Sequence, residues 1–202
     1  HGAVYRFGAP LDIGWLSAGW SAHLEFWHRG IRVRTDFVTR PPRLSPGRLA
    51  RLWREQEQND PPFLGVSDLI ETKKTNREKD YAVIGELARL AEDIEDRLKY
   101  SRSARDLIGL ASDHPARVAG LKGVRPVLAS IPDGREALEA ALDAERRRLI
   151  HENEDRLLLY LKAAEEWGRA WPGLSQSLKG RPLSSAHEEM VAGALRLLPA
   201  SV

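Results

Sequence analysis

Two runs of alternating apolar and polar residues meet at Arg29-Gly30, and this pattern constrains the fold more than any other part of the sequence. Alternation with a period of two predicts strands that bury one face, and a glycine between such runs predicts a hairpin. A two-residue turn would pair His28 with Ile31 and, further from the turn, His23 with Asp36. Because a slip of one residue would exchange the two faces, the pattern fixes this register. The apolar face would hold Leu24, Phe26, Ile31, Val33 and Phe37, and the polar face His23, Glu25, Arg32, Arg34 and Asp36.

Short apolar runs on either side of the hairpin predict further strands. Val4–Phe7 and Leu11–Leu16 are two such runs, and Pro10 and Gly14 disfavour a helix in this part of the chain. A third run, Phe63–Val66, follows a proline-rich turn. We therefore expect strands before and after the hairpin.

Residues 65–81 predict a short helix, a polar elbow and the start of a longer helix. Ser67 can cap the first helix, and Asp68 and Glu71 would lie in its first turn, where negative charge suits the helix dipole. Nine polar residues follow, Thr72–Asp80. Four of them are cations, a grouping that suits a phosphate, although a solvated charged face has the same composition. These cations are Lys73, Lys74, Arg77 and Lys79.

Most of the remaining chain has helical spacing of its apolar residues. The first expected helix begins at Ser45-Pro46 and ends at about Gln58. Three more are expected over residues 77–100, 103–112 and 115–130, and a long one from Arg135 to Trp171, ended by Pro172-Gly173. The last runs from Ser185, which forms a capping box with Glu188, to Leu198. The fold class is therefore α+β. We expect a small mixed sheet with helices over residues 1–95 and a C-terminal helical bundle over residues 96–202.

Composition excludes several classes of site. The 202 residues include no cysteine, which excludes disulfides and thiolate chemistry and favours a cytoplasmic protein. No apolar run is long enough to span a membrane, so no membrane partner is expected. The net charge is only +2, but the first fifty residues hold seven arginines against three acids. This basic N-terminal part suits nucleotides or nucleic acid.

Asp36 is a candidate metal ligand. It would lie near the end of a strand on the polar face of the hairpin, and carboxylate oxygens are the ligands that Mg²⁺ prefers. The alternative is an ion pair with Arg34 or His23 on an open sheet face.

Two segments resemble the minimal nucleotidyltransferases of bacteria, a group that includes the toxins of abortive-infection toxin–antitoxin pairs. Arg32–Val38 resembles the strand that carries the third catalytic carboxylate of that family. Asp68–Asp80 resembles a second pattern of that family, in which Leu-Ile is followed by Lys and then by Arg-x-Lys-Asp at the start of a helix. The resemblance covers about residues 20–95 and implies a nucleotidyltransferase-like sheet in this part of the chain.

The resemblance implies transfer of a nucleoside monophosphate from a nucleoside triphosphate to a hydroxyl, with Mg²⁺ stabilising the developing charge. Asp36 would ligate the metal or act as the base, with Arg34 and His23 as supporting residues. The nucleotide is the implied ligand, and a tRNA acceptor and a cognate antitoxin protein are the implied partners.

The same resemblance assigns the elbow to the triphosphate. Lys73 and Arg77 would contact the phosphates, and Lys74 and Lys79 would add positive field. Asp80 would cap the following helix or hold Arg77 in place.

The acidic pair that precedes the third carboxylate in this family is not found before Asp36. In the family, a Gly-Ser turn and an Asp-x-Asp or Asp-x-Glu pair come first, and the pair supplies two of the three metal ligands. In this sequence, Asp93-Ile-Glu95 and Glu152-Asn-Glu154 have similar spacing but follow Asp36 and lie in helical patterns. Because the chain starts with His rather than Met, one expectation is that the pair lies upstream. The other is a degenerate, non-catalytic member that binds a nucleotide or docks a partner on its 135–171 helix.

Overall fold

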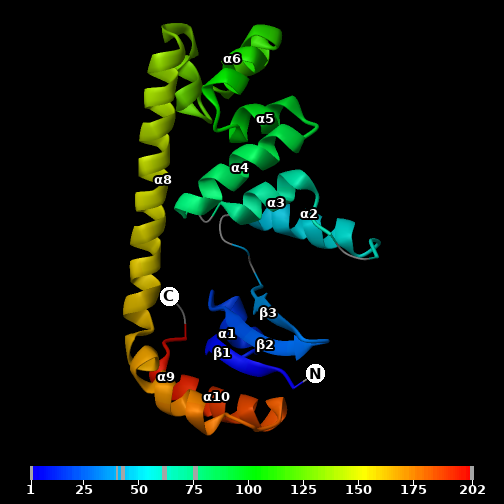
Figure 1. The fold of residues 1–202 in the computed structure, drawn as a ribbon, viewed down its shortest axis with the longest axis vertical. Coiled ribbons are helices and arrows are strands. Elements are labelled where there is room, and N and C mark those ends of the chain that lie inside the picture. Colours follow the sequence, from blue (N-terminus) through cyan, green and yellow to red (C-terminus); the bar gives the residue numbers. More distant parts are fainter. Residues whose placement is uncertain (1, 40, 42–43, 61–62, 75–76, 201–202) are drawn as a thin grey trace. The chain divides into compact units, whose positions relative to one another are not determined.

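The computed structural model describes residues 2–39, 41, 44–60, 63–74 and 77–200 (Figure 1). The chain forms two compact units, one from residues 1–41 and 156–202 and the other from residues 42–155. The sequence placed the boundary at residue 95, whereas the contacts join the N-terminal segment to the C-terminal one. The architecture is α+β, with one three-stranded sheet and many helices.

The sheet belongs to the first unit, and its strands are β1 (Val4–Gly8), β2 (Ala22–His28) and β3 (Ile31–Phe37), in the order β1-β2-β3. Both strand pairs are antiparallel. A mixed sheet was expected, but the strands in the described part of the chain include no parallel pair.

The hairpin register is confirmed. His28 pairs with Ile31 and His23 with Asp36, as the alternation predicted. Arg29 and Gly30 form the turn with φ values of 50° and 77°, and two successive positive φ angles match the twist of a tight hairpin. Arginine rarely adopts this conformation, so the paired strands impose it on Arg29.

Two expected strands are absent. Leu11–Leu16 was predicted as a strand, but Ile13–Ser17 forms the short helix α1, because the Asp12 side chain accepts a hydrogen bond from the Gly14 backbone N–H at 2.8 Å and caps its first turn. Phe63–Val66 was also predicted as a strand; residues 63–65 form no regular element and Val66 begins a helix.

Two C-terminal helices, α9 (Glu165–Ser177) and α10 (Leu183–Leu197), pack beside β1 and complete the core of the first unit (Figure 1). Trp167 is 1% exposed and donates its indole N–H to the Gly8 carbonyl at 3.1 Å. It packs with Tyr5, Leu24 and Met190, which are all buried. The sheet is therefore stabilised by residues almost 160 positions away in the sequence.

The second unit is helical. Its elements are α2 (Pro46–Gln56), α3 (Val66–Lys73), α4 (Glu78–Leu90), α5 (Ile94–Tyr100), α6 (Ala104–Asp113), α7 (Pro115–Leu121), the 3-10 helix η1 (Pro126–Asp133) and residues 135–155 of α8 (Arg135–Ala163). Ser45 caps α2 as expected, accepting from the Arg48 N–H at 3.2 Å. In the described part of the chain, no helix is both long and apolar enough to cross a membrane.

Several helix boundaries differ from the predictions. Ser67 is inside α3 rather than its cap, because the helix begins at Val66 after Gly65. The predicted 77–100 helix is interrupted where Asp93 caps α5 by accepting from the Glu95 N–H at 2.8 Å. The 135–171 helix is divided at Ala164, and Pro172 and Gly173 lie within α9 instead of ending a helix. The last helix begins at Leu183, two residues before the expected Ser185 cap.

Candidate phosphate-binding pocket

Asp36 lies in β3 of the first unit, opposite His23 in β2. Its Oδ1 atom is 2.5 Å from His23 Nδ1, and its side chain is 66% exposed. Ser21 Oγ lies 2.9 Å from the other ring nitrogen, so the imidazole is held at both ends. Arg34 instead binds Glu25, at 3.2 Å. Of the two alternative partners expected for Asp36, the structure therefore shows His23.

Asp36 alone does not make a Mg²⁺ site. One of its oxygens is engaged by His23, and no three His, Asp or Glu side chains in the described part of the chain come together as metal ligands. Mg²⁺ prefers about six oxygen ligands, with water supplying some of them. The residues present do not fit the metal by themselves, so no reaction step is derived through it.

The elbow lies between α3 and α4 of the second unit, and its Thr75 and Asn76 fall outside the described residues. Arg77 is half-exposed and donates from Nε to Asp80 Oδ2 at 2.8 Å. The Asp80 carboxylate is buried in the first turn of α4, where its negative charge faces the helix N-terminus. This contact holds Arg77 against the start of α4.

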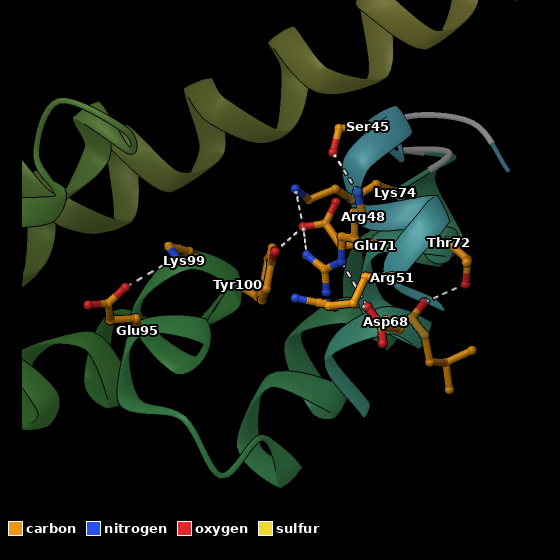
Figure 2. Close-up of polar contacts among 11 residues, drawn as sticks. Ser45, Arg48, Arg51, Asp68, Glu71, Thr72, Lys74, Glu95, Lys99 and Tyr100 are labelled. Atoms are coloured by element: carbon orange, nitrogen blue, oxygen red, sulfur yellow. Dashed lines mark hydrogen bonds and ion pairs between the residues drawn. The ribbon is translucent and has the colours of Figure 1, made fainter. Parts of the chain in front are cut away.

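Lys74 is the C-cap residue that follows α3, and two neighbouring side chains hold it in place. Its ammonium donates to Glu71 Oε1 at 2.8 Å, one helical turn earlier, and lies 4.8 Å from the centre of the Tyr100 ring (Figure 2). A cation over an aromatic face is attracted by the ring's negative quadrupole. Of the four elbow cations, Lys74 is the one that lines the pocket described below; Lys73, Arg77 and Lys79 are not among its described lining residues.

Glu71 is the centre of the buried network shown in Figure 2. It accepts hydrogen bonds from Lys74 and from the Tyr100 hydroxyl, and Arg48 Nη1 lies 3.4 Å from its carboxylate. Burial alone would raise the pKa of Glu71, but these hydrogen bonds and nearby cations outweigh it and lower the pKa. Burial and the contact with Glu71 raise the pKa of Tyr100. At neutral pH, Glu71 is therefore ionised and Tyr100 keeps its proton.

Arg48 connects this network to α2. Its Nε atom donates to Asp68 Oδ1 at 2.8 Å, and Arg51 Nη2 approaches the same oxygen at 3.4 Å (Figure 2). The two arginines are one helical turn apart on α2, so both face the carboxylate on α3. The network fixes α2, α3 and α5 together and holds Lys74 at the pocket.

The pocket itself has a volume of about 420 Å³, within the range of small-molecule sites. Five of its lining side chains are cationic and two are acidic, and its apolar surface comes from two aliphatic side chains and one aromatic ring. The lining residues are Glu71, Lys74, Lys99, Tyr100, Arg102, Val124, Arg125, Glu145, Arg148 and Leu149. The excess of cations makes the pocket attractive to an anion.

One wall of the pocket is a buried ion cluster. Glu145 in α8 accepts from Arg125 Nε at 3.0 Å, from Arg125 Nη2 at 2.9 Å and from Arg102 Nη1 at 2.5 Å. Burial raises the pKa of Glu145, but the two guanidinium groups and Arg148 together lower it. Arg125 also donates to the backbone carbonyls of Leu98 at 2.7 Å and Ser101 at 2.8 Å, which satisfies the end of α5.

Lys74 was predicted from the sequence as a candidate phosphate-binding residue, but most of the other residues of the pocket were not. The other cations come from segments that were predicted only as helices or turns, far apart in the sequence: Lys99, Arg102, Arg125 and Arg148. The only local signal was the cluster of charged and aromatic residues at 99–102, where a helix ends.

Comparison of the chain with protein-family models, with curated proteins and with solved structures gives no match.

Proposed function

We propose that this protein binds a nucleoside triphosphate with its phosphates in the Lys74 pocket, as part of a nucleotidyltransferase-like activity. The observation that carries the proposal is the environment of Lys74. Lys74, to which the resemblance gave only a supporting positive field, lines a pocket with more cationic than acidic side chains, whereas Lys73 and Arg77 are not among its described lining residues.

The chemistry of the pocket suits a nucleotide. Lys74 and Lys99 are about 30% exposed, so their ammonium groups can reach a ligand from the sides of the pocket. Phosphate oxygens attract such groups and accept strong hydrogen bonds from them. Leu149 and Val124 supply apolar surface against which a base can pack.

The proposed reaction transfers a nucleoside monophosphate to a hydroxyl acceptor. The resemblance alone, and not any contact between the two units, assigns Asp36 to this reaction as its base, with His23 orienting the carboxylate. The proposed acceptor is tRNA, and a cognate antitoxin protein is the proposed partner. Because the substrate is a nucleoside triphosphate, the proposed compartment is the cytoplasm. The nucleotidyltransferase-like fold and the C-terminal bundle remain part of this proposal.

A second candidate function is nucleotide binding without transfer, on a degenerate scaffold. It is favoured by the single carboxylate at Asp36, because a two-metal transfer site needs further acids close by. In this case the protein would act through partners that recognise its nucleotide-bound form.

A transfer assay tests the proposal. The protein is incubated with labelled nucleoside triphosphates, Mg²⁺ and total RNA, and nucleotide binding is measured in parallel by calorimetry. We expect Lys74→Gln to weaken binding by about tenfold, because a charge-assisted contact is lost. Asp36→Ala should abolish labelling and leave binding intact. Lys122→Gln and Asp113→Ala, two exposed changes outside the pocket, serve as controls.

The labelling and binding results distinguish the two candidate functions. Labelling that survives Asp36→Ala would remove this residue from the mechanism. Binding that depends on Lys74 without any labelling would select the non-catalytic function. The absence of nucleotide binding would overturn the proposed function.

A further inference from the structure

We propose that Arg102, held by Glu145 and supported by Arg125, forms an inner subsite of the Lys74 pocket that binds a phosphoryl group of a polyphosphate chain. This inference deepens the proposed function and rests on the same pocket. The ligand chemistry is a chain of linked phosphoryl groups, and its source is either a nucleoside triphosphate or inorganic triphosphate.

The first argument is the charge balance of the buried wall. The side chains of Arg102, Arg125 and Glu145 are 8%, 5% and 11% exposed, so water screens them poorly. One carboxylate therefore faces two guanidinium groups. Burying unmatched charge is costly, and an anion entering the adjoining pocket would supply the missing negative charge.

The second argument is the use of hydrogen-bond donors. Arg125 is occupied on Nε and both terminal nitrogens by Glu145, Leu98 and Ser101. Arg102 donates from Nη1 to Glu145, and its Nε, which has no hydrogen-bond partner among the described residues, is too deeply buried to meet a ligand. Because a guanidinium has five N–H donors, Arg102 retains donors on its terminal nitrogens for a ligand. Arg125 is thus the structural member of the pair and Arg102 the binding member.

The third argument is the positioning of Arg102. Its guanidinium lies 4.5 Å from the centre of the Tyr81 ring, and Tyr81 is fixed by donating its hydroxyl hydrogen to the Leu142 carbonyl at 3.1 Å. Stacking and the bond to Glu145 hold the guanidinium plane, which reduces the entropy lost when it binds a planar pair of phosphate oxygens. Lys74 and Arg148 line the same pocket and can contact the rest of the chain of phosphates.

Titration with inorganic triphosphate tests the subsite, because this probe has no base or ribose. Binding is measured by calorimetry for the full chain and for Arg102→Gln, and we expect the variant to bind about tenfold or more weakly. Arg105→Gln is the matched control, since Arg105 is exposed and is not among the described lining residues of this pocket. Should Arg102→Gln fail to fold, Arg102→Lys is measured instead, because lysine keeps the positive charge but lacks the planar pair of donors; the expected loss is about threefold or more, and unchanged binding would overturn the subsite.

The outcomes separate this inference from the proposed function. Triphosphate binding that depends on Arg102, with no nucleotide binding, would support the subsite and overturn the proposed function. Nucleotide binding of equal strength in the wild type and in Arg102→Gln would overturn the subsite and leave the proposed function standing. The absence of binding by either ligand would overturn both.

Discussion

Glu145→Gln is expected to lower the free energy of unfolding of the helical unit by about 3–5 kcal/mol, the usual cost of removing one member of a buried ion pair. The amide keeps the shape of the side chain but removes the one carboxylate that lies between Arg102 and Arg125. Two like charges would then remain close together with little screening. The loss should be visible as a shift of the urea midpoint followed by circular dichroism.

The acidity of Glu145 gives this prediction a second readout. Its pKa is lowered from the ordinary value of 4.5 by the surrounding arginines, so the carboxylate stabilises the fold above about pH 4.5 and loses this contribution as the pH falls through its folded pKa. The difference between the wild type and Glu145→Gln should therefore shrink in acid. Glu139→Gln is the control on the same helix, because Glu139 is half-exposed and its ion pair among the described residues is with the exposed Arg135. Equal effects of the two substitutions would contradict the role of the buried cluster.

Trp167→Ala is expected to destabilise the first unit by about 3–5 kcal/mol, since it removes a large core side chain and leaves a cavity. Trp167 fills the space between the sheet and α10, contacts Trp171 at 6.1 Å between ring centroids, and satisfies the Gly8 carbonyl. The Gly8 carbonyl would lose this partner in the variant.

Urea denaturation also measures this effect, and Trp27→Ala is the matched control because Trp27 is 62% exposed. The control should change the midpoint little. A loss for Trp167→Ala no larger than that for Trp27→Ala would show that the sheet does not depend on the C-terminal helices.

The sequence was most informative where structure is local. The hairpin register followed from alternation alone, and so did the placement of His23 opposite Asp36. Helix N-caps were harder to predict from the sequence. Asp12 starts a helix in a segment where Pro10 and Gly14 argued against one, because one side-chain hydrogen bond outweighed the weak propensities of that segment.

The candidate site was predictable only in part, for a physical reason. Lys74 belongs to a short motif and could be found from the sequence. Glu145 lies 20 residues from Arg125 and 43 from Arg102, and the three side chains meet only because the neighbouring helices pack together. The spacing of apolar residues within one helix does not predict such a contact. The two compact units also depend on contacts between residues 1–41 and 156–202, which leave no local signal in the sequence.

The central claim is that nucleotide phosphates bind in the Lys74 pocket, and lysine acetylation followed by mass spectrometry tests it most directly. The protein is briefly acetylated with and without a saturating nucleoside triphosphate, and the modification of each lysine is compared. Lys122 and Lys179 are exposed and are not among the described lining residues of the pocket, so they report nonspecific effects. The account predicts that the nucleotide protects Lys74 and Lys99 and leaves Lys122 and Lys179 unchanged. Unchanged acetylation of Lys74 in nucleotide-saturated protein would contradict it.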